Sequence, residues 1–140
     1  MEQERFKHYT LGIDAIDHQH KELFNSINII AELHDKNKLT IETFSILQTQ
    51  LIKHFREEEI LMNSVGYPYV MSHIDRHKHL ESKMTEFIDR FNMTIDKRSI
   101  INFLEKMIII HIDNTDRNFS DWCKDNDACR VSLAGKTIVS

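Results

Sequence analysis

The chain has 140 residues, 41% of them hydrophobic and 29% charged, with a formal net charge of −4, which suits one domain over residues 1–140. Only three glycines and one proline are present, too few turn formers for a many-stranded β architecture. Lysines and arginines are scattered among acidic residues rather than gathered into a stripe, which argues against a nucleic-acid partner.

Apolar residues recur every three or four positions in four segments, and this period predicts four helices. The first segment covers about residues 16–34 and carries His20 in its apolar face. After a polar break, the second segment covers about residues 40–65 and carries His54 and Glu58 in the same way. A Gly-Tyr-Pro turn then ends the second helix.

The third and fourth segments cover about residues 70–91 and 104–122, with a polar break between them. The polar residues on or beside their apolar faces are His73, His77, His111 and Asp116. Four helices joined by short connections predict an all-α fold, an up-down-up-down antiparallel four-helix bundle. We expect the bundle over about residues 11–123, between a short N-terminal arm and a C-terminal tail.

Seven residues with metal-binding side chains therefore lie on the apolar faces or at their edges. They are His20, His54, Glu58, His73, His77, His111 and Asp116. Burying five imidazoles and two carboxylates is unfavourable unless a cation lies among them, so the set predicts a di-metal site in the bundle core. Nitrogen and oxygen donors without thiolate suit iron, with zinc or manganese as alternatives.

The spacing of these residues bears on how many metal ions they hold. Two pairs are separated by four residues, which places both side chains of each pair on one helix face. His111 and Asp116 are five residues apart, about 140° around a straight helix. We therefore expect them to flank the inward face and to serve different atoms of a dinuclear site. No histidine follows a glutamate by three residues, which disfavours a ferritin-like di-iron site.

Several stretches carry a family resemblance: Gly12-Ile13, Ile16 to Phe24, His54 to Glu59, Gly66-Tyr67-Pro68, His73 with His77, and His111-Ile112 with Asp116. With them the chain resembles a hemerythrin, specifically a single-domain bacteriohemerythrin. The resemblance implies a non-haem, oxo- or hydroxo-bridged di-iron centre that binds O2. One iron would be held by His73, His77 and His111, and the other by His20 and His54. The two irons would be bridged by Glu58 and Asp116.

The resemblance also implies a function, reversible O2 binding for oxygen storage or for delivery to oxygen-requiring enzymes, rather than catalysis. The iron held by two histidines would offer the open position for O2. By position relative to the motifs, the O2 pocket would be lined by Phe55, Met107, Ile108, Ile112 and Thr115. The alternatives are oxygen or redox sensing through a protein partner, and di-iron peroxidase or nitric-oxide chemistry.

The remaining features receive ordinary interpretations. His18 lies two residues off the apolar stripe, so we assign the ligand position to His20. The spacing of Cys123 and Cys129 matches neither a zinc knuckle nor a redox Cys-x-x-Cys motif. No apolar run approaches the roughly 20 residues of a membrane span, and no signal peptide is evident. We expect a cytoplasmic protein with no membrane partner and two reduced thiols.

Overall fold

A computed structural model of the chain describes residues 10–93, 96–127 and 129. Most of the predicted N-terminal arm and C-terminal tail lie outside these residues, so the single domain over residues 1–140 stays a prediction. The helices are α2 Asp14–Asp35, α3 Ile41–Ser64, α4 Val70–Arg90, the short 3-10 turn η1 Phe91–Met93, α5 Lys97–Ile110, the π-helical turn η2 His111–Asp116, and α6 Arg117–Lys124. The described residues contain no strand.

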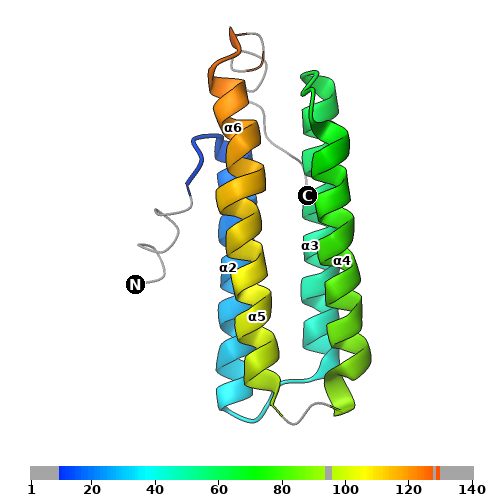
Figure 1. The fold of residues 1–140 in the computed structure, drawn as a ribbon. Helices are drawn as coiled ribbons and strands as arrows, with labels where there is room; N and C mark the ends of the chain where they lie inside the picture. Colours follow the sequence, from blue (N-terminus) through cyan, green and yellow to red (C-terminus); the bar gives the residue numbers. More distant parts are fainter. Residues whose placement is uncertain (1–9, 94–95, 128, 130–140) are drawn as a thin grey trace.

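Successive long helices run in opposite directions, so the predicted antiparallel four-helix bundle is confirmed (Figure 1). The segments α5, η2 and α6 follow one another without a break and together form the fourth long helix. It packs beside α2, while α3 packs beside α4 and α2. None of the described helices combines the length and apolar character that crossing a lipid bilayer requires.

The end of the bundle that contains the α2–α3 and α4–α5 connections holds an ordinary apolar core. Its large, fully buried side chains include Ile27, Phe44, Leu47, Met84 and Ile101. Burial of each such side chain contributes about 1.5–3 kcal/mol to folding. The other half also buries apolar side chains, including Ile16, Met62 and Phe119, but its core contains buried polar residues as well.

Local signals in the sequence set the helix ends. Thr40 is the N-cap of α3, with its hydroxyl accepting from the Thr43 amide, and the Asp96 side chain accepts from Ser99 in the same way before α5. Gly66, with φ of +71°, follows the end of α3, as expected for a residue free to adopt a left-handed conformation.

The segment before α2 is held by hydrogen bonds to α2 and to α6. The Asp17 carboxylate accepts hydrogen bonds from the backbone amides of Leu11 and Gly12, at 2.8 and 3.0 Å. The buried Ser120 hydroxyl donates to the Leu11 carbonyl at 2.7 Å. The bond from Ser120 connects the start of the bundle to α6, more than a hundred residues later in the chain.

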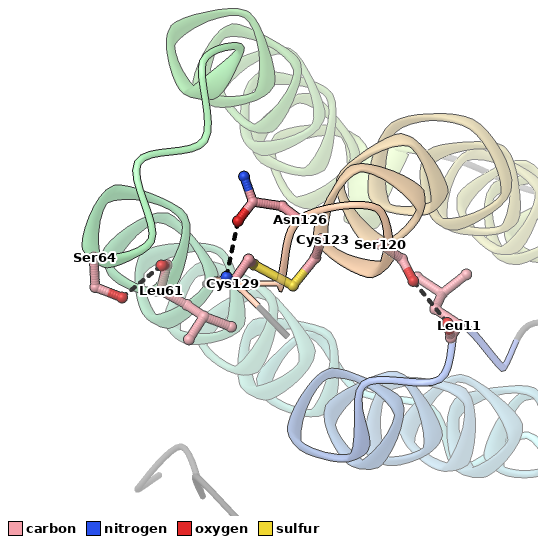
Figure 2. The surroundings of a disulfide bond; sticks show 7 residues. All are labelled: Leu11, Leu61, Ser64, Ser120, Cys123, Asn126 and Cys129. Atoms are coloured by element: carbon pink, nitrogen blue, oxygen red, sulfur yellow. Dashed lines mark hydrogen bonds between the residues drawn. A yellow bond between two sulfur atoms is a disulfide. The ribbon is translucent and has the colours of Figure 1, made fainter. Parts of the chain in front are cut away.

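Cys123 and Cys129 are joined in a disulfide, so the prediction of two reduced thiols is wrong (Figure 2). The chain turns after the end of α6 and brings the two Cα atoms to 5.2 Å, a separation that a disulfide can span. Both residues are buried, and the Cys129 amide donates to the Asn126 side chain at 3.0 Å. Spacing alone could not reveal this turn, because it depends on where α6 ends.

Candidate metal centre

All seven predicted metal-binding residues lie buried in the core at one end of the bundle. The antiparallel topology causes this, because the N-terminal halves of α2 and α4 lie beside the C-terminal halves of α3 and of the fourth helix (Figure 1). No side chain of the set is more than 6% exposed. Residues from the four long helices therefore surround one buried volume that is shielded from solvent.

Their donor atoms form two overlapping groups, and within each group all donor atoms lie within 4.8 Å of one another. The first group contains Glu58, His73, His77, His111 and Asp116. The second contains His20, His54, Glu58 and Asp116. The two carboxylates belong to both groups, and each histidine belongs to one.

The Glu58 carboxylate turns one oxygen toward each group. Its Oε1 lies 2.7 Å from His73 Nε2 and 3.1 Å from His77 Nε2. Its Oε2 lies 3.4 Å from Nε2 of His54, one turn earlier on the same helix. Glu58 thus lies between the two groups in the orientation of a bridging carboxylate.

Asp116 has the same relationship to the two groups. Its Oδ1 lies 2.9 Å from His73 Nε2 and 3.0 Å from His111 Nε2. Its Oδ2 lies 2.9 Å from Nε2 of His20 on the opposite helix. Two carboxylates from different helices therefore link the same two sets of imidazoles.

Most of these short contacts are not hydrogen bonds. Nε2 of His20, His54, His73 and His111 has no hydrogen-bond partner among the described residues, and the same holds for Oε2 of Glu58 and both Asp116 oxygens. An unpartnered buried polar atom costs about 1–3 kcal/mol. Cations among these atoms would satisfy them together, and the nitrogen and oxygen donors fit iron. The residues present therefore fit the metal that the sequence predicts.

The backbone between His111 and Asp116 departs from the straight helix assumed in the sequence analysis. These six residues form a π-helical turn, in which hydrogen bonds close over five residues rather than four. Both side chains consequently point into the core, and both join the group of five donors. The expectation that they flank opposite edges of the inward face is therefore wrong.

The carboxylates control the protonation of the cluster. Burial and the Asp116 charge act to raise the pKa of Glu58, but His73, His77 and His54 together lower it to about 2. Burial likewise acts to lower the pKa of His73, but the Asp116 and Glu58 carboxylates raise it to about 10. In the metal-free protein the two carboxylates therefore favour the protonated form of His73, and they also act to raise the pKa of His20.

Two further side chains, Gln19 and Glu59, position histidines of the site. His54 Nδ1 forms a hydrogen bond with the Gln19 side-chain oxygen, and the Gln19 amide donates to Glu57. Gln19 is itself buried. Because the other ring nitrogen is engaged in this way, Nε2 of His54 is directed at the carboxylates.

His77 has an equivalent partner in Glu59. Its Nδ1 donates to Glu59 Oε2 at 2.7 Å, and Arg56 donates to the same oxygen at 2.7 Å. No role for Glu59 or Gln19 was predicted from the sequence. Both lie next to a predicted ligand in the sequence, but only the packing of neighbouring helices shows which imidazole each one contacts.

The residues predicted to line an O2 pocket occupy different environments. Phe55 stacks on His77 with ring centroids 3.9 Å apart, and Ile108 and Ile112 are buried. Met107 and Thr115 are partly buried. Their role in an O2 pocket stays a prediction.

The other described histidines lie away from the metal centre, as expected for His18. His18 is 70% exposed at its side chain and pairs with Glu22 on the same helix. His79 faces solvent and His34 is partly exposed near the end of α2. His8 lies outside the described residues.

Comparison with known proteins gives a consistent result. A family model described as "Hemerythrin HHE cation binding domain" matches residues 11–123. The chain is 33% identical over 82 residues to "Bacteriohemerythrin" of Campylobacter jejuni strain 81-176, which covers 56% of this chain and 62% of that protein. It is 29% identical over 123 residues to "Bacteriohemerythrin" of Clostridium acetobutylicum. This match covers 81% of the present chain and 95% of the relative. No solved structure matches the chain.

Proposed function

The chain belongs to the hemerythrin family, and from that premise we propose that it binds O2 reversibly at a non-haem di-iron centre held by the seven buried residues. The observation that carries the proposal is that Glu58 and Asp116 both lie between the two groups of imidazoles. Each carboxylate has one oxygen facing the first group and the other oxygen facing the second. Such an arrangement supports two metal ions rather than one. Reversible two-electron binding of O2 is the chemistry that an iron pair supplies there.

The two groups of donors differ in number, and this difference favours one side for O2. One group offers five protein ligands and the other four. If the two ions shared one solvent-derived bridge and each took six ligands, the ion beside His20 and His54 would have one protein ligand fewer and could bind O2 in that place. We propose that O2 reaches this ion past the apolar side chains of the fourth helix.

The protein contributes orientation and exclusion of water. Gln19 and Glu59 engage Nδ1 of His54 and of His77, which leaves Nε2 of each ring directed inward as the metal-binding nitrogen. Phe55 stacks on His77, and Ile112, next to His111 in the sequence, is buried. A dry, apolar pocket favours release of O2 over irreversible oxidation of the metal.

We propose a carrier rather than an enzyme, acting in the cytoplasm in oxygen storage or in delivery to oxygen-requiring enzymes. The five predicted pocket residues carry no acid or base that could serve a catalytic proton transfer. Peroxidase or nitric-oxide chemistry, and oxygen sensing through a partner, remain the alternative functions. Steady turnover of peroxide with a reductant would favour the first, and a partner bound only to the oxygenated form would favour the second.

The first experiment is metal analysis combined with visible spectroscopy. The iron-loaded protein is reduced without air, exposed to O2 and then purged with inert gas. Two irons per chain and a colour that appears with O2 and disappears on purging would establish a reversible carrier. Irreversible conversion to the oxidised form would favour redox or sensing chemistry, and binding of zinc alone would reject the proposal.

Variants of the bridging residues test the proposed ligands. Glu58→Ala and Asp116→Ala should each lose most of the iron and some helical stability, since histidines would then lie in the core without their counter-charge. Glu42→Ala, an exposed glutamate in the first turn of α3, is the control. A Glu58→Ala protein that kept two irons and normal O2 binding would refute the ligand assignment.

A further inference from the structure

A cleft of about 360 Å³ opens on the outside of the metal centre. It lies between the first turns of α4 and the η2 and α6 segments of the fourth helix. Its volume falls within the usual range of small-molecule sites. The residues that form it include Tyr67, Ser72, His73, Arg76, Asn118 and Trp122. None of the residues lining the cleft carries a carboxylate. That composition is unusual in a chain whose net charge is negative.

Arg76 is a cation without a counter-charge in this cleft. Its guanidinium makes no hydrogen bond or ion pair with any residue that the structure describes. By contrast, Arg56, Arg98 and Arg117 each pair with a carboxylate. An unpaired guanidinium in a cleft without acids presents a forked donor suited to a carboxylate or a phosphate.

His73 adds a buried donor at the same place. The side chain is 3% exposed, and its Nδ1 has no hydrogen-bond partner in the described part of the chain. Nδ1 of His77 and of His54 each has a partner, Glu59 and Gln19 respectively. An imidazole whose Nε2 faces a metal nearly always donates its other N–H to an acceptor, but among the described residues neither His73 nor His20 has one. Of these two histidines, His73 lines the cleft, so a ligand bound there could supply its acceptor.

The walls provide further donors and flat surfaces. Among the described residues, the Ser72 hydroxyl, the Asn118 amide and the Trp122 indole have no hydrogen-bond partner. The rings of Tyr67 and Trp122 lie 5.2 Å apart between centroids and offer aromatic faces and edges to a planar group.

We propose that this cleft binds an oxyanion, a carboxylate or phosphate group, carried on a planar ring. The oxyanion lies between the Arg76 guanidinium and His73 Nδ1–H and accepts from both. The ring packs against Tyr67 and Trp122. The cleft shares Thr115 with the predicted O2 pocket, but its ligand contacts the outer edge of a metal-binding imidazole rather than the metal.

The chain itself provides a probe, because Trp122 is its only tryptophan. Benzoate and phenyl phosphate are titrated into the metal-free protein while Trp122 fluorescence is followed, and calorimetry repeats the titration on the iron-loaded protein. Benzamide, a neutral molecule with the shape of benzoate, is the control ligand. We expect saturable binding of at least one anion and at least tenfold weaker binding of benzamide. The relative affinities of the two anions show whether the group recognised is a carboxylate or a phosphate.

Variants separate the charge of Arg76 from general effects of charge. Arg76→Gln should weaken anion binding at least tenfold, whereas Lys83→Gln, on the same helix but paired with Glu86, should leave it unchanged. Equal binding of benzamide, no saturable binding of either anion, or an unchanged affinity in Arg76→Gln would overturn the proposal. Iron content and O2 binding are measured on the same samples, so failure of this site and failure of the O2 proposal give different results.

Discussion

The Nε2 atom of His111 lies 3.0 Å from the Oδ1 atom of Asp116, although five residues separate them in the sequence. On a straight α-helix this separation turns the two side chains about 140° apart. The π-helical turn between them adds one residue to the turn and returns Asp116 to the inward face. Without it, Asp116 could not lie between the two groups of imidazoles.

Deletion of Asn114 tests the role of the π-helical turn. Asn114 is exposed within the turn, and its removal should leave an ordinary α-helix in which His111 and Asp116 are four residues apart. That spacing is the one that already places His54 and Glu58 on one face. We expect the deletion variant to keep its metal, with affinity reduced less than tenfold, as measured by metal analysis and competition with a chelator.

Deletion of Lys106 is the matched control. Lys106 is exposed in the regular α-helix before the turn, so its loss rotates every later side chain by about 100° relative to the rest of the bundle. That variant should lose both metal ions. Equal loss of metal from the two deletion variants would contradict the role given to the turn.

Gln19 should control metal affinity without being a ligand. Gln19→Leu removes the hydrogen-bond partner of His54 Nδ1, and loss of such a partner typically costs 10- to 100-fold in metal affinity. We expect a loss of this size for the metal ion beside His20 and His54. Stepwise chelator competition measures it.

Gln50→Leu is the control for this prediction, because Gln50 lines the same surface cleft as Gln19 but bonds to Ser26. It should retain the original affinity for both metal ions. If Gln19→Leu matched this control, the hydrogen bond to His54 would have no role in metal binding.

The stability of the metal-free protein should be greatest near pH 6.5. Although burial opposes it, the pKa of His73 is raised to about 10 by Asp116 and Glu58, so its stabilising contribution is complete below about pH 6.5 and is lost as the pH rises toward 10. Burial lowers the pKa of His54 to about 4. His54 therefore destabilises the folded protein as the pH falls from about 6.5 toward 4, because the unfolded state binds this proton at a higher pH than the folded state does.

Urea unfolding in the presence of a chelator, at about pH 5, 6.5 and 9, measures this dependence. Each group contributes a slope of up to about 1.4 kcal/mol per pH unit within its range. Loading with zinc should remove the alkaline loss, because the metal then replaces the proton on His73. A free energy of unfolding that stayed constant between about pH 6.5 and 9 in the metal-free protein would argue against a raised pKa of His73.

Reduction of the Cys123–Cys129 disulfide should lower the free energy of unfolding by about 2 kcal/mol, the value expected for a short closed loop. The bond fixes the chain where α6 ends, two turns beyond Asp116. Thermal unfolding with and without a phosphine reductant measures the change. Cys123→Ala/Cys129→Ala should be destabilised to a similar extent and should not respond to the reductant, and a wild-type protein equally stable in both conditions would speak against the bond.

Much of the site could be predicted from the sequence because helical periodicity is local. The spacing of His54 with Glu58 and of His73 with His77 depends only on the turn of one helix, and the structure brings all four side chains into the core. The same reasoning identified His111 and Asp116 but misplaced them at opposite edges of the inward face, because periodicity assumes a regular helix. It also missed Gln19 and Glu59, whose partners lie on other helices.

The four helices, their antiparallel order and the seven polar residues on their inward faces could be predicted from the sequence, since each depends on short-range spacing and on the burial of apolar side chains. The way in which Glu58 and Asp116 each turn one oxygen to either group, the bond between Cys123 and Cys129, and the unpaired Arg76 in the cleft that His73 lines became visible in the folded structure. Those relationships depend on the distances between helices and on the widened turn, neither of which is encoded in the period of a single segment.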